Sequence, residues 1–148
     1  AYMCGLLHNI GYLVLAQVFQ NEYTWANAVI ASKPEEPITA IEQQLLGATH
    51  ADLGQLLMQS WSMPGEITAC ATEHHNPAYE GEHARYVWLT QLSDQLLKPH
   101  GLSDADTDEL SLSQCEQLGL SPDQLDIALN DVIQSKDVLE SIVQMLTG

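Results

Sequence analysis

Residues 41–64 read IEQQLLGATHADLGQLLMQSWSMP and contain clear signals for where helices end and begin. Gly47 follows an apolar helical segment at the position of a C-cap. Thr49 is a good N-cap, and Asp52 places an acid in the first turn that follows it. These residues predict a helix over His50–Gln59, directly after a shorter helix that ends before Gly47.

The pattern continues downstream. Pro64 suits the first position of a further helix, which we expect to run to about His74. Pro77 breaks this helix, and a polar loop leads into a longer predicted helix over Glu82–Leu97. That helix is expected to stop at Pro99, because proline cannot continue it.

The two ends of the chain carry similar signals. Residues 1–31 hold two apolar stretches that are broken around Gly11 and again near Asn21, which predicts two or three short helices. Residues 101–111, GLSDADTDELS, form an acidic connector, and a short helix that ends at Gly119 is expected to follow. A further helix is predicted to start at Ser121-Pro122. Apolar residues recur along it at helical spacing and predict a buried stripe: Leu125, Leu129, Val132, Leu139, Val143 and Leu146. We find no alternating strand pattern, so the sequence predicts an all-α fold.

Composition excludes several classes of function. The 148 residues are 45% hydrophobic, which is ordinary for one globular domain and excludes a disordered chain. Four basic residues against twenty acids give a net charge of −16, and residues 101–148 hold one base and ten acids. So few bases disfavour binding to nucleic acid or to an anionic membrane surface. No apolar run approaches the length of a membrane-spanning helix.

The cysteines and the first residues suggest a location and a context. Cys4, Cys70 and Cys115 are far apart and odd in number, so we expect buried free thiols in a reducing compartment. No secretory signal is found, and the expected location is the cytoplasm. The opening AYMCGLLHNIGYLVL resembles core sequence from its first residue, which predicts that helices preceding residue 1 in a longer protein complete the bundle.

Histidines and acids are the candidates for chemistry. Imidazole and carboxylate groups suit Zn, Fe, Mn or Ni when several of them converge, and a helical bundle can present such ligands inward. Each residue taken singly also has an ordinary structural explanation, and spacing alone does not establish convergence. The candidates are His8 in GLLHNIG, His50, the pair His74 and His75 in EHHNP, and Asp94 in LTQLSDQLL.

Five landmarks in order resemble the HDOD domain. They are GLLHNIGYLVL, then E-x-x-x-x-G-x-T-H-x-x-x-G over Glu42–Gly54, the turn Trp61–Pro64, EHHNP and LSDQLL. The resemblance implies that residues 1–98 are part of an HD-type helical bundle that lacks its N-terminal helices. Residues 99–148 are then an acidic linker and C-terminal amphipathic helices, which we expect to pack on that core.

The HDOD domain is the non-catalytic relative of the HD and HD-GYP phosphohydrolases, whose histidines and aspartates hold metal. The resemblance maps these ligand positions onto His8, Asn9, His50, His74, His75 and Asp94. Asn9 stands where those enzymes have a metal-bridging aspartate, and a neutral amide cannot bridge two cations as a carboxylate does. Tyr12 replaces a usual lysine, and the GYP signature is missing after EHHNPAYEG.

The resemblance implies a non-enzymatic bacterial signalling module that acts through protein–protein contacts and needs no cofactor. Its expected partners are other signalling proteins, including sensor kinases, or fused receiver, GGDEF or EAL domains, and it could form a homo-oligomer. The metal pocket is then degenerate, with its residues hydrogen-bonded to one another. Two alternatives stay open. One is a phosphohydrolase that acts on a nucleotide or cyclic dinucleotide with Fe, Mn or Ni, and the other is a structural interaction domain whose pocket has no role.

Overall fold

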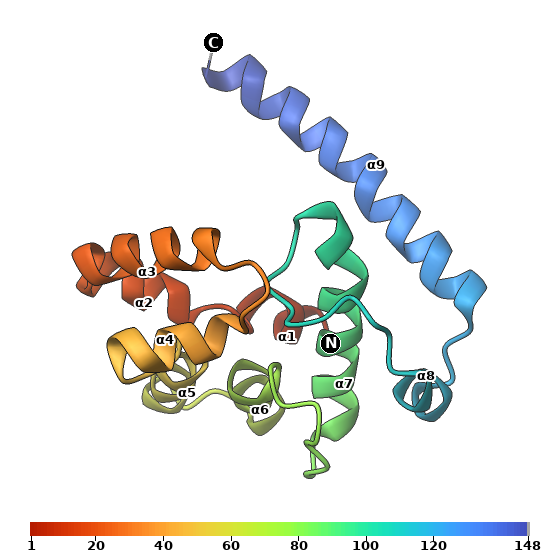
Figure 1. The fold of residues 1–148 in the computed structure, drawn as a ribbon. Coiled ribbons are helices and arrows are strands. Elements are labelled where there is room, and N and C mark those ends of the chain that lie inside the picture. Colours follow the sequence, from red (N-terminus) through yellow and green to blue (C-terminus); the bar gives the residue numbers. More distant parts are fainter. Residues whose placement is uncertain (148) are drawn as a thin grey trace. The chain divides into compact units, whose positions relative to one another are not determined.

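The computed structural model describes the backbone of residues 1–147 and the side chains of residues 1–136 and 145. Over this backbone the chain forms only helices and their connections, which confirms the predicted all-α class (Figure 1). In chain order the helices are α1 (Tyr2–Leu7), α2 (Gly11–Val18), α3 (Gln20–Ser32), α4 (Ile38–Leu46), α5 (His50–Ser60), α6 (Gly65–Glu73), α7 (Ala84–Leu97), the 3-10 turn η1 (Lys98–His100), α8 (Leu112–Leu118) and α9 (Pro122–Thr147).

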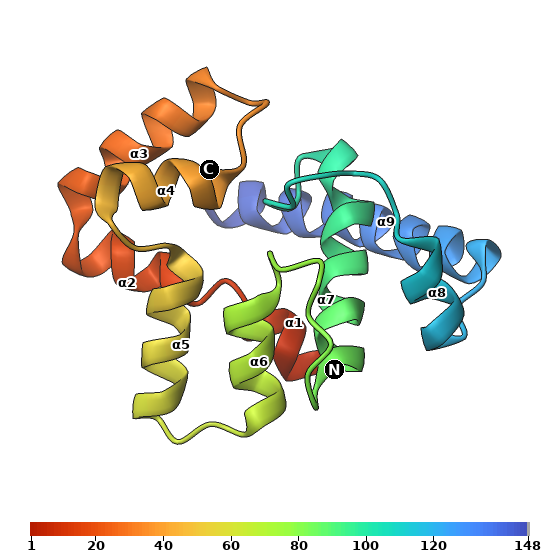
Figure 2. The same ribbon diagram turned by 60° about the horizontal axis from the view of Figure 1, so that its bottom comes forward.

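The chain divides into two compact units, Ala1–Glu109 and Leu110–Gly148. In the first unit α5 packs against α6 and α2, while α3 packs against α2 and α4 (Figures 1 and 2). Helix α1 lies against both α6 and α7. The apolar centre of this unit consists of Cys4, Met58, Ile67, Cys70, Ala71 and Val87.

Helix boundaries fall close to where local sequence signals predict them. Gly47 ends α4 in the left-handed conformation, with φ of 75°. The Thr49 side chain accepts a hydrogen bond from the Asp52 amide, and Asp52 accepts one from the Thr49 amide, which forms a complete capping box. These caps fix His50 as the first residue of α5, so its ring enters the core from the helix N-terminus.

Gly11 allows α2 to approach α5 closely. A Cβ atom at this position would lie 1.8 Å from the carbonyl oxygen of His50 and 2.9 Å from the amide nitrogen of Gly54. Both atoms belong to the backbone, which cannot move aside as a flexible side chain can. The glycine therefore brings the turn between α1 and α2 next to the start of α5.

The remaining boundaries follow the sequence with small differences. Helix α7 starts at Ala84 instead of Glu82, because the Ala84 amide donates to the Gly81 carbonyl and closes a turn. In the second unit, Gly119 ends α8 with φ of 71°, and Ser121 and Gln124 cap α9 through reciprocal hydrogen bonds.

The predicted stripe on α9 is described only in part. Leu125 is buried and Val132 is exposed, while the side chains of Leu139, Val143 and Leu146 lie outside the described residues. Residues 99–109 lie in the same compact unit as the core, and the packing of the C-terminal helices α8 and α9 on that core stays a prediction.

All three cysteines are buried free thiols, as the sequence predicts. Among the helices described over residues 1–147, none combines the length and the apolar character that a membrane span requires.

Candidate functional site

His50 is fully buried at the start of α5, where Glu42 of α4 fixes its orientation. The Glu42 carboxylate accepts from the His50 amide at 2.9 Å and from its ring Nδ1 at 2.8 Å. Because a carboxylate takes the Nδ1 hydrogen, the neutral ring carries its lone pair on Nε2. Glu42 itself is only 1% exposed, so these two hydrogen bonds replace the bonds to water that its buried carboxylate oxygen would otherwise make.

His74 and His75 follow the end of α6, and both direct their Nε2 atoms toward Nε2 of His50. His74 donates from Nδ1 to the Cys70 carbonyl at 3.0 Å, and its Nε2 lies 3.1 Å from Nε2 of His50. His75 places its own Nε2 3.2 Å from Nε2 of His50, while its Nδ1 lies 3.5 Å from a carboxylate oxygen of Asp106. Three imidazole nitrogens therefore converge on one point.

His8 and Asp94 lie on the neighbouring side of this cluster. His8 donates from Nδ1 to the Gly5 carbonyl at 2.8 Å, and its Nε2 lies 3.4 Å from a carboxylate oxygen of Asp94 on α7. The His8 and His74 rings meet edge to face, with their centroids 5.1 Å apart. The structure thus brings together five of the six residues that the sequence analysis proposed as ligands.

Asp104 completes the cluster, although the sequence analysis did not identify it. One of its carboxylate oxygens lies 3.6 Å from Nε2 of both His50 and His75. Asn9 donates to the other oxygen at 3.1 Å, and the Tyr12 hydroxyl donates to the first at 2.8 Å. Tyr12 also stacks on the His50 ring at a centroid distance of 4.1 Å. The sixth proposed residue, Asn9, therefore reaches the cluster through Asp104.

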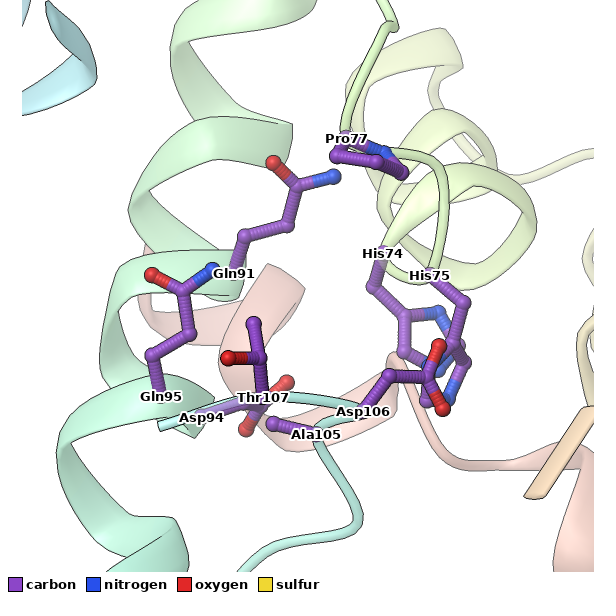
Figure 3. Close-up of a pocket in the computed structure, with 9 residues that line it drawn as sticks. All are labelled: His74, His75, Pro77, Gln91, Asp94, Gln95, Ala105, Asp106 and Thr107. Atoms are coloured by element: carbon purple, nitrogen blue, oxygen red, sulfur yellow. The ribbon is translucent and has the colours of Figure 1, made fainter. Parts of the chain in front are cut away.

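Residues 103–107, which we call the strap, carry Asp104 into the cluster. The Ser103 hydroxyl donates to the Asp94 carbonyl at 2.5 Å, and Lys98 donates to the Ala105 carbonyl at 2.6 Å. A cavity of 80 Å³ lies beside the strap. Figure 3 shows Gln91 and Gln95 of α7 facing the two histidines across this cavity, with Ala105 and Asp106 at its edge.

Burial and the neighbouring histidines act in the same direction on the pKa of His74, whereas burial and neighbouring charges oppose each other at His75 and Asp94. Burial, together with the neighbouring His75 and His50, lowers the pKa of His74 to about 2. Burial also opposes charge on His75, but its contacts with Asp104 and Asp106 outweigh burial and raise its pKa to about 9. Burial raises the pKa of Asp94 to about 6 despite the opposing effect of His8.

Asp104 and Tyr12 keep complementary protonation states. Burial works against a charge on Asp104, but His75 and Asn9 hold the pKa of this carboxyl well below its usual range. Burial and the negative Asp104 raise the pKa of Tyr12 far above its ordinary value. Asp104 is therefore an ionised acceptor near neutral pH, and Tyr12 is a hydroxyl donor.

The donor set fits a divalent cation. Ligand atoms of His50, His74, His75 and Asp104 all lie within 4.8 Å of one another, and a second group joins His8, Asp94 and Asp104. Nδ1 of each of the four histidines faces a carbonyl or carboxylate oxygen, which is the outer-shell arrangement of metal-bound imidazoles. Two further buried atoms, Nε2 of His8 and Oδ1 of Asn9, have no hydrogen-bond partner.

Two residues of this site, Asp104 and Glu42, were not identified from the sequence, because their surroundings in the chain do not indicate their roles. Asp104 belongs to the acidic connector, where the D-x-D pattern after the last core helix resembles ordinary solvated acids. Glu42 is the first residue of the motif over Glu42–Gly54 that contains His50, but no neighbouring residue indicates that its carboxylate accepts hydrogen bonds from that histidine.

The fold and this cluster define an all-helical domain with histidines and aspartates gathered at the junction of its helices. The family model of the HDOD domain matches residues 1–77. The chain therefore belongs to the HDOD family, as its sequence landmarks predict.

Two relatives extend this result. A crystal structure of a protein from Marinobacter aquaeolei VT8, whose name assigns it to signal transduction, matches with a TM-score of 0.81 and 32% identity over 99% of this chain. An uncharacterized protein of Treponema pallidum (strain Nichols) is 28% identical over 76 residues, or 51% of this chain. The chain spans 32% of the Marinobacter protein and the match covers 15% of the Treponema protein. The comparisons thus support a domain related to signalling.

Proposed function

We propose that this chain is a non-enzymatic regulatory module of bacterial signal transduction that acts through contacts with other proteins. Membership of the HDOD family and the name of the Marinobacter relative support a signalling role. The proposed partners are other signalling proteins or fused receiver, GGDEF or EAL domains. We propose the cytoplasm as its location, because three buried free thiols suit a reducing compartment.

The observation that carries this proposal is the position of Asp104. A metal-dependent hydrolase needs an open coordination position for the attacking water and the substrate. Here a carboxylate of the chain itself lies 3.6 Å from Nε2 of His50 and His75, where such groups would have to bind. The strap that carries it is hydrogen-bonded to the core on both sides of Asp104.

Asn9 favours the same conclusion. Its amide nitrogen donates to Asp104, a role that an aspartate at position 9 could not take because two carboxylates would face each other. The neutral amide at position 9 is therefore a suitable hydrogen-bond donor for the carboxylate at position 104. The negative charge of the site has moved from the HD motif to the strap.

A metal-dependent phosphohydrolase is the second candidate, and the convergence of the histidine nitrogens favours it. In that case His50, His74 and His75 would hold a cation, which would lower the pKa of a bound water. Asp104 would have to leave the cluster before a phosphoester could enter.

Hydrolysis of bis(p-nitrophenyl) phosphate separates the two candidates. The wild-type protein, His50→Ala and His100→Ala are assayed with Fe²⁺, Mn²⁺ or Ni²⁺. His100 is the matched control, because it is exposed in η1 and lies outside both groups of converging ligands. We expect no release of p-nitrophenol above the metal-only blank from any of them. Turnover by wild type and His100→Ala that is lost in His50→Ala would contradict the proposed function.

A further inference from the structure

We propose that His50, His74, His75 and Asp104 bind one divalent transition-metal cation, and that this cation fastens the strap to the helical core. The inference rests on the proposed function, since it assigns a regulatory role to a site that has no turnover. It adds a ligand, Asp104, that lies outside the residues matched by the family model.

The first argument is the direction of the lone pairs. Glu42 and the Cys70 carbonyl take the Nδ1 hydrogens of His50 and His74, so both Nε2 atoms present lone pairs to each other at 3.1 Å. Two lone pairs at this distance repel unless something positive lies between them. A shared proton can satisfy one pair of acceptors, whereas a cation at the common point satisfies three nitrogens and a carboxylate together.

The second argument is the spacing of the ligands. Two ligands of a tetrahedral zinc ion, each about 2.0–2.1 Å from the metal, lie about 3.3–3.4 Å apart. Two of the three His–His distances in this group are 3.1 and 3.2 Å, two of the three His–Asp104 distances are 3.6 Å, and all of the ligand atoms lie within 4.8 Å of one another. Three imidazoles and one carboxylate form a closed set of four, which is typical of a structural site and not of a catalytic one.

The outer shell is also in place. Glu42 orients His50, the Cys70 carbonyl orients His74, and Asp106 faces His75. Asn9 and Tyr12 orient the Asp104 carboxylate. Such partners fix the tautomer and direction of each ligand before a metal arrives.

The neighbouring group is a weaker candidate for a second cation. It offers one imidazole, His8, and two carboxylates, one of which is Asp104 itself. Nε2 of His8 lies 3.4 Å from a carboxylate oxygen of Asp94, so these two groups can attract each other directly, without a cation between them. We therefore assign one cation to the chain.

The consequence is a link between the cation and the strap. Three ligands lie in α5 and at the end of α6, and the fourth lies in the strap, which leads along the chain to residues 110–148. A cation that binds only when Asp104 is in place stabilises that state, and by the same linkage anything that displaces the strap weakens cation binding. The affinity of a partner that contacts the strap would thus depend on whether the cation is bound, and the partner would in turn change the affinity for the cation.

Zinc titration of the metal-free full chain tests the ligand set. Calorimetry should give one Zn²⁺ per chain, and Asp104→Asn should weaken binding by more than the roughly 10–100-fold that loss of an outer-shell partner costs. Asp108→Asn is the matched control, because Asp108 is an exposed acid of the same connector, and it should leave the affinity unchanged. No binding, or equal affinity in Asp104→Asn, would overturn the proposal.

A nitroxide at Glu109→Cys tests the link to the strap. The three native thiols are buried, so this exposed position takes the label selectively. Zn²⁺ should slow the motion of the label in the otherwise unsubstituted chain and leave it unchanged in Asp104→Asn. If Asp104→Asn does not fold, the labelled chain that keeps Asp104 still tests the link. An unchanged spectrum of that chain on Zn²⁺ binding would contradict a link between the cation and the strap.

The two proposals fail in different ways. Zinc binding together with phosphodiester turnover would contradict the proposed function and leave the ligand set intact. Absence of both would contradict the cation site and leave the non-enzymatic role intact.

Discussion

At the scale of single residues, the pairing of Asn9 with Asp104 determines the chemistry of the site. The Asn9 amide donates to the Asp104 carboxylate at 3.1 Å, at a position where the resemblance to HD phosphohydrolases implies a metal-bridging aspartate. The carboxylate of this pair lies on the strap, and the neutral amide lies between α1 and α2. Whether the cluster is open or closed then depends on where the strap lies.

Asn9→Asp should destabilise the metal-free protein. The substitution removes a hydrogen bond to a charged group and places two carboxylates in contact, which should lower the free energy of unfolding by roughly 1–3 kcal/mol. Urea unfolding in a chelator, followed by circular dichroism, measures the change. Asn21→Asp is the control, because Asn21 is exposed on α3.

The double variant Asn9→Asp/Asp104→Asn should recover most of that stability, since an amide at position 104 can donate to a carboxylate at position 9. Additive losses in the double variant would show that the two residues do not interact as described.

Glu42→Gln should weaken the site through His50. The buried carboxylate accepts two hydrogen bonds from His50, and loss of its charge should lower the free energy of unfolding by about 1.5–3 kcal/mol. Zinc affinity should fall by roughly 10–100-fold, because a neutral amide oxygen is a weaker acceptor for Nδ1 and no longer raises the basicity of the ring. The same calorimetric titration measures it, with the exposed Glu35→Gln as control. An unchanged zinc affinity would mean that Glu42 does not orient His50 for metal binding and contributes only to the packing of the core.

At the scale of the elements, the crossing of α2 and α5 brings the site together. Gly11→Ala places a methyl group 1.8 Å from the His50 carbonyl oxygen, so the two helices must separate. We expect a loss of about 3 kcal/mol or more in the free energy of unfolding, at the upper end for overpacked cores. Urea unfolding measures it.

Gly5→Ala is the matched control for Gly11→Ala. An added Cβ at Gly5 has no other atom within 4 Å, and alanine favours the helix α1, so stability should stay equal or rise by up to about 1 kcal/mol. Equal stability of the two alanine variants would contradict the close helix contact.

The helix boundaries could be predicted from the sequence, whereas the packing of the helices around the site could not. The caps at Gly47, Thr49 and Gly119 were predicted because their physics is confined to a few neighbouring residues. The convergence of His8, His50, His74 and Asp94 was expected only through the family resemblance, since it depends on how α1, α5, α6 and α7 pack.

The arrival of Asp104 was not predicted at all. Its contacts come from residues 95 and 92 positions away in the chain, Asn9 and Tyr12, and an acidic connector carries no local sign of them. The turn that delays the start of α7 to Ala84 was missed for a simpler reason, because residues 82 and 83 are compatible with either a turn or a helix.

At the scale of the whole molecule, the strap belongs to the first compact unit and precedes the acidic residues 110–148 in the chain. The chain covers 32% of its Marinobacter relative. Cation binding at α5 and α6 would then fix the chain that leads out of the core. Such a device needs a closed site, because turnover would require the strap to leave.

The anomalous difference map of crystals grown with zinc, measured at the zinc edge, tests this account most directly. We predict one peak per chain, about 2.0–2.2 Å from Nε2 of His50, His74 and His75 and from a carboxylate oxygen of Asp104. Two peaks bridged by water, or one peak without Asp104 among its ligands, would contradict it.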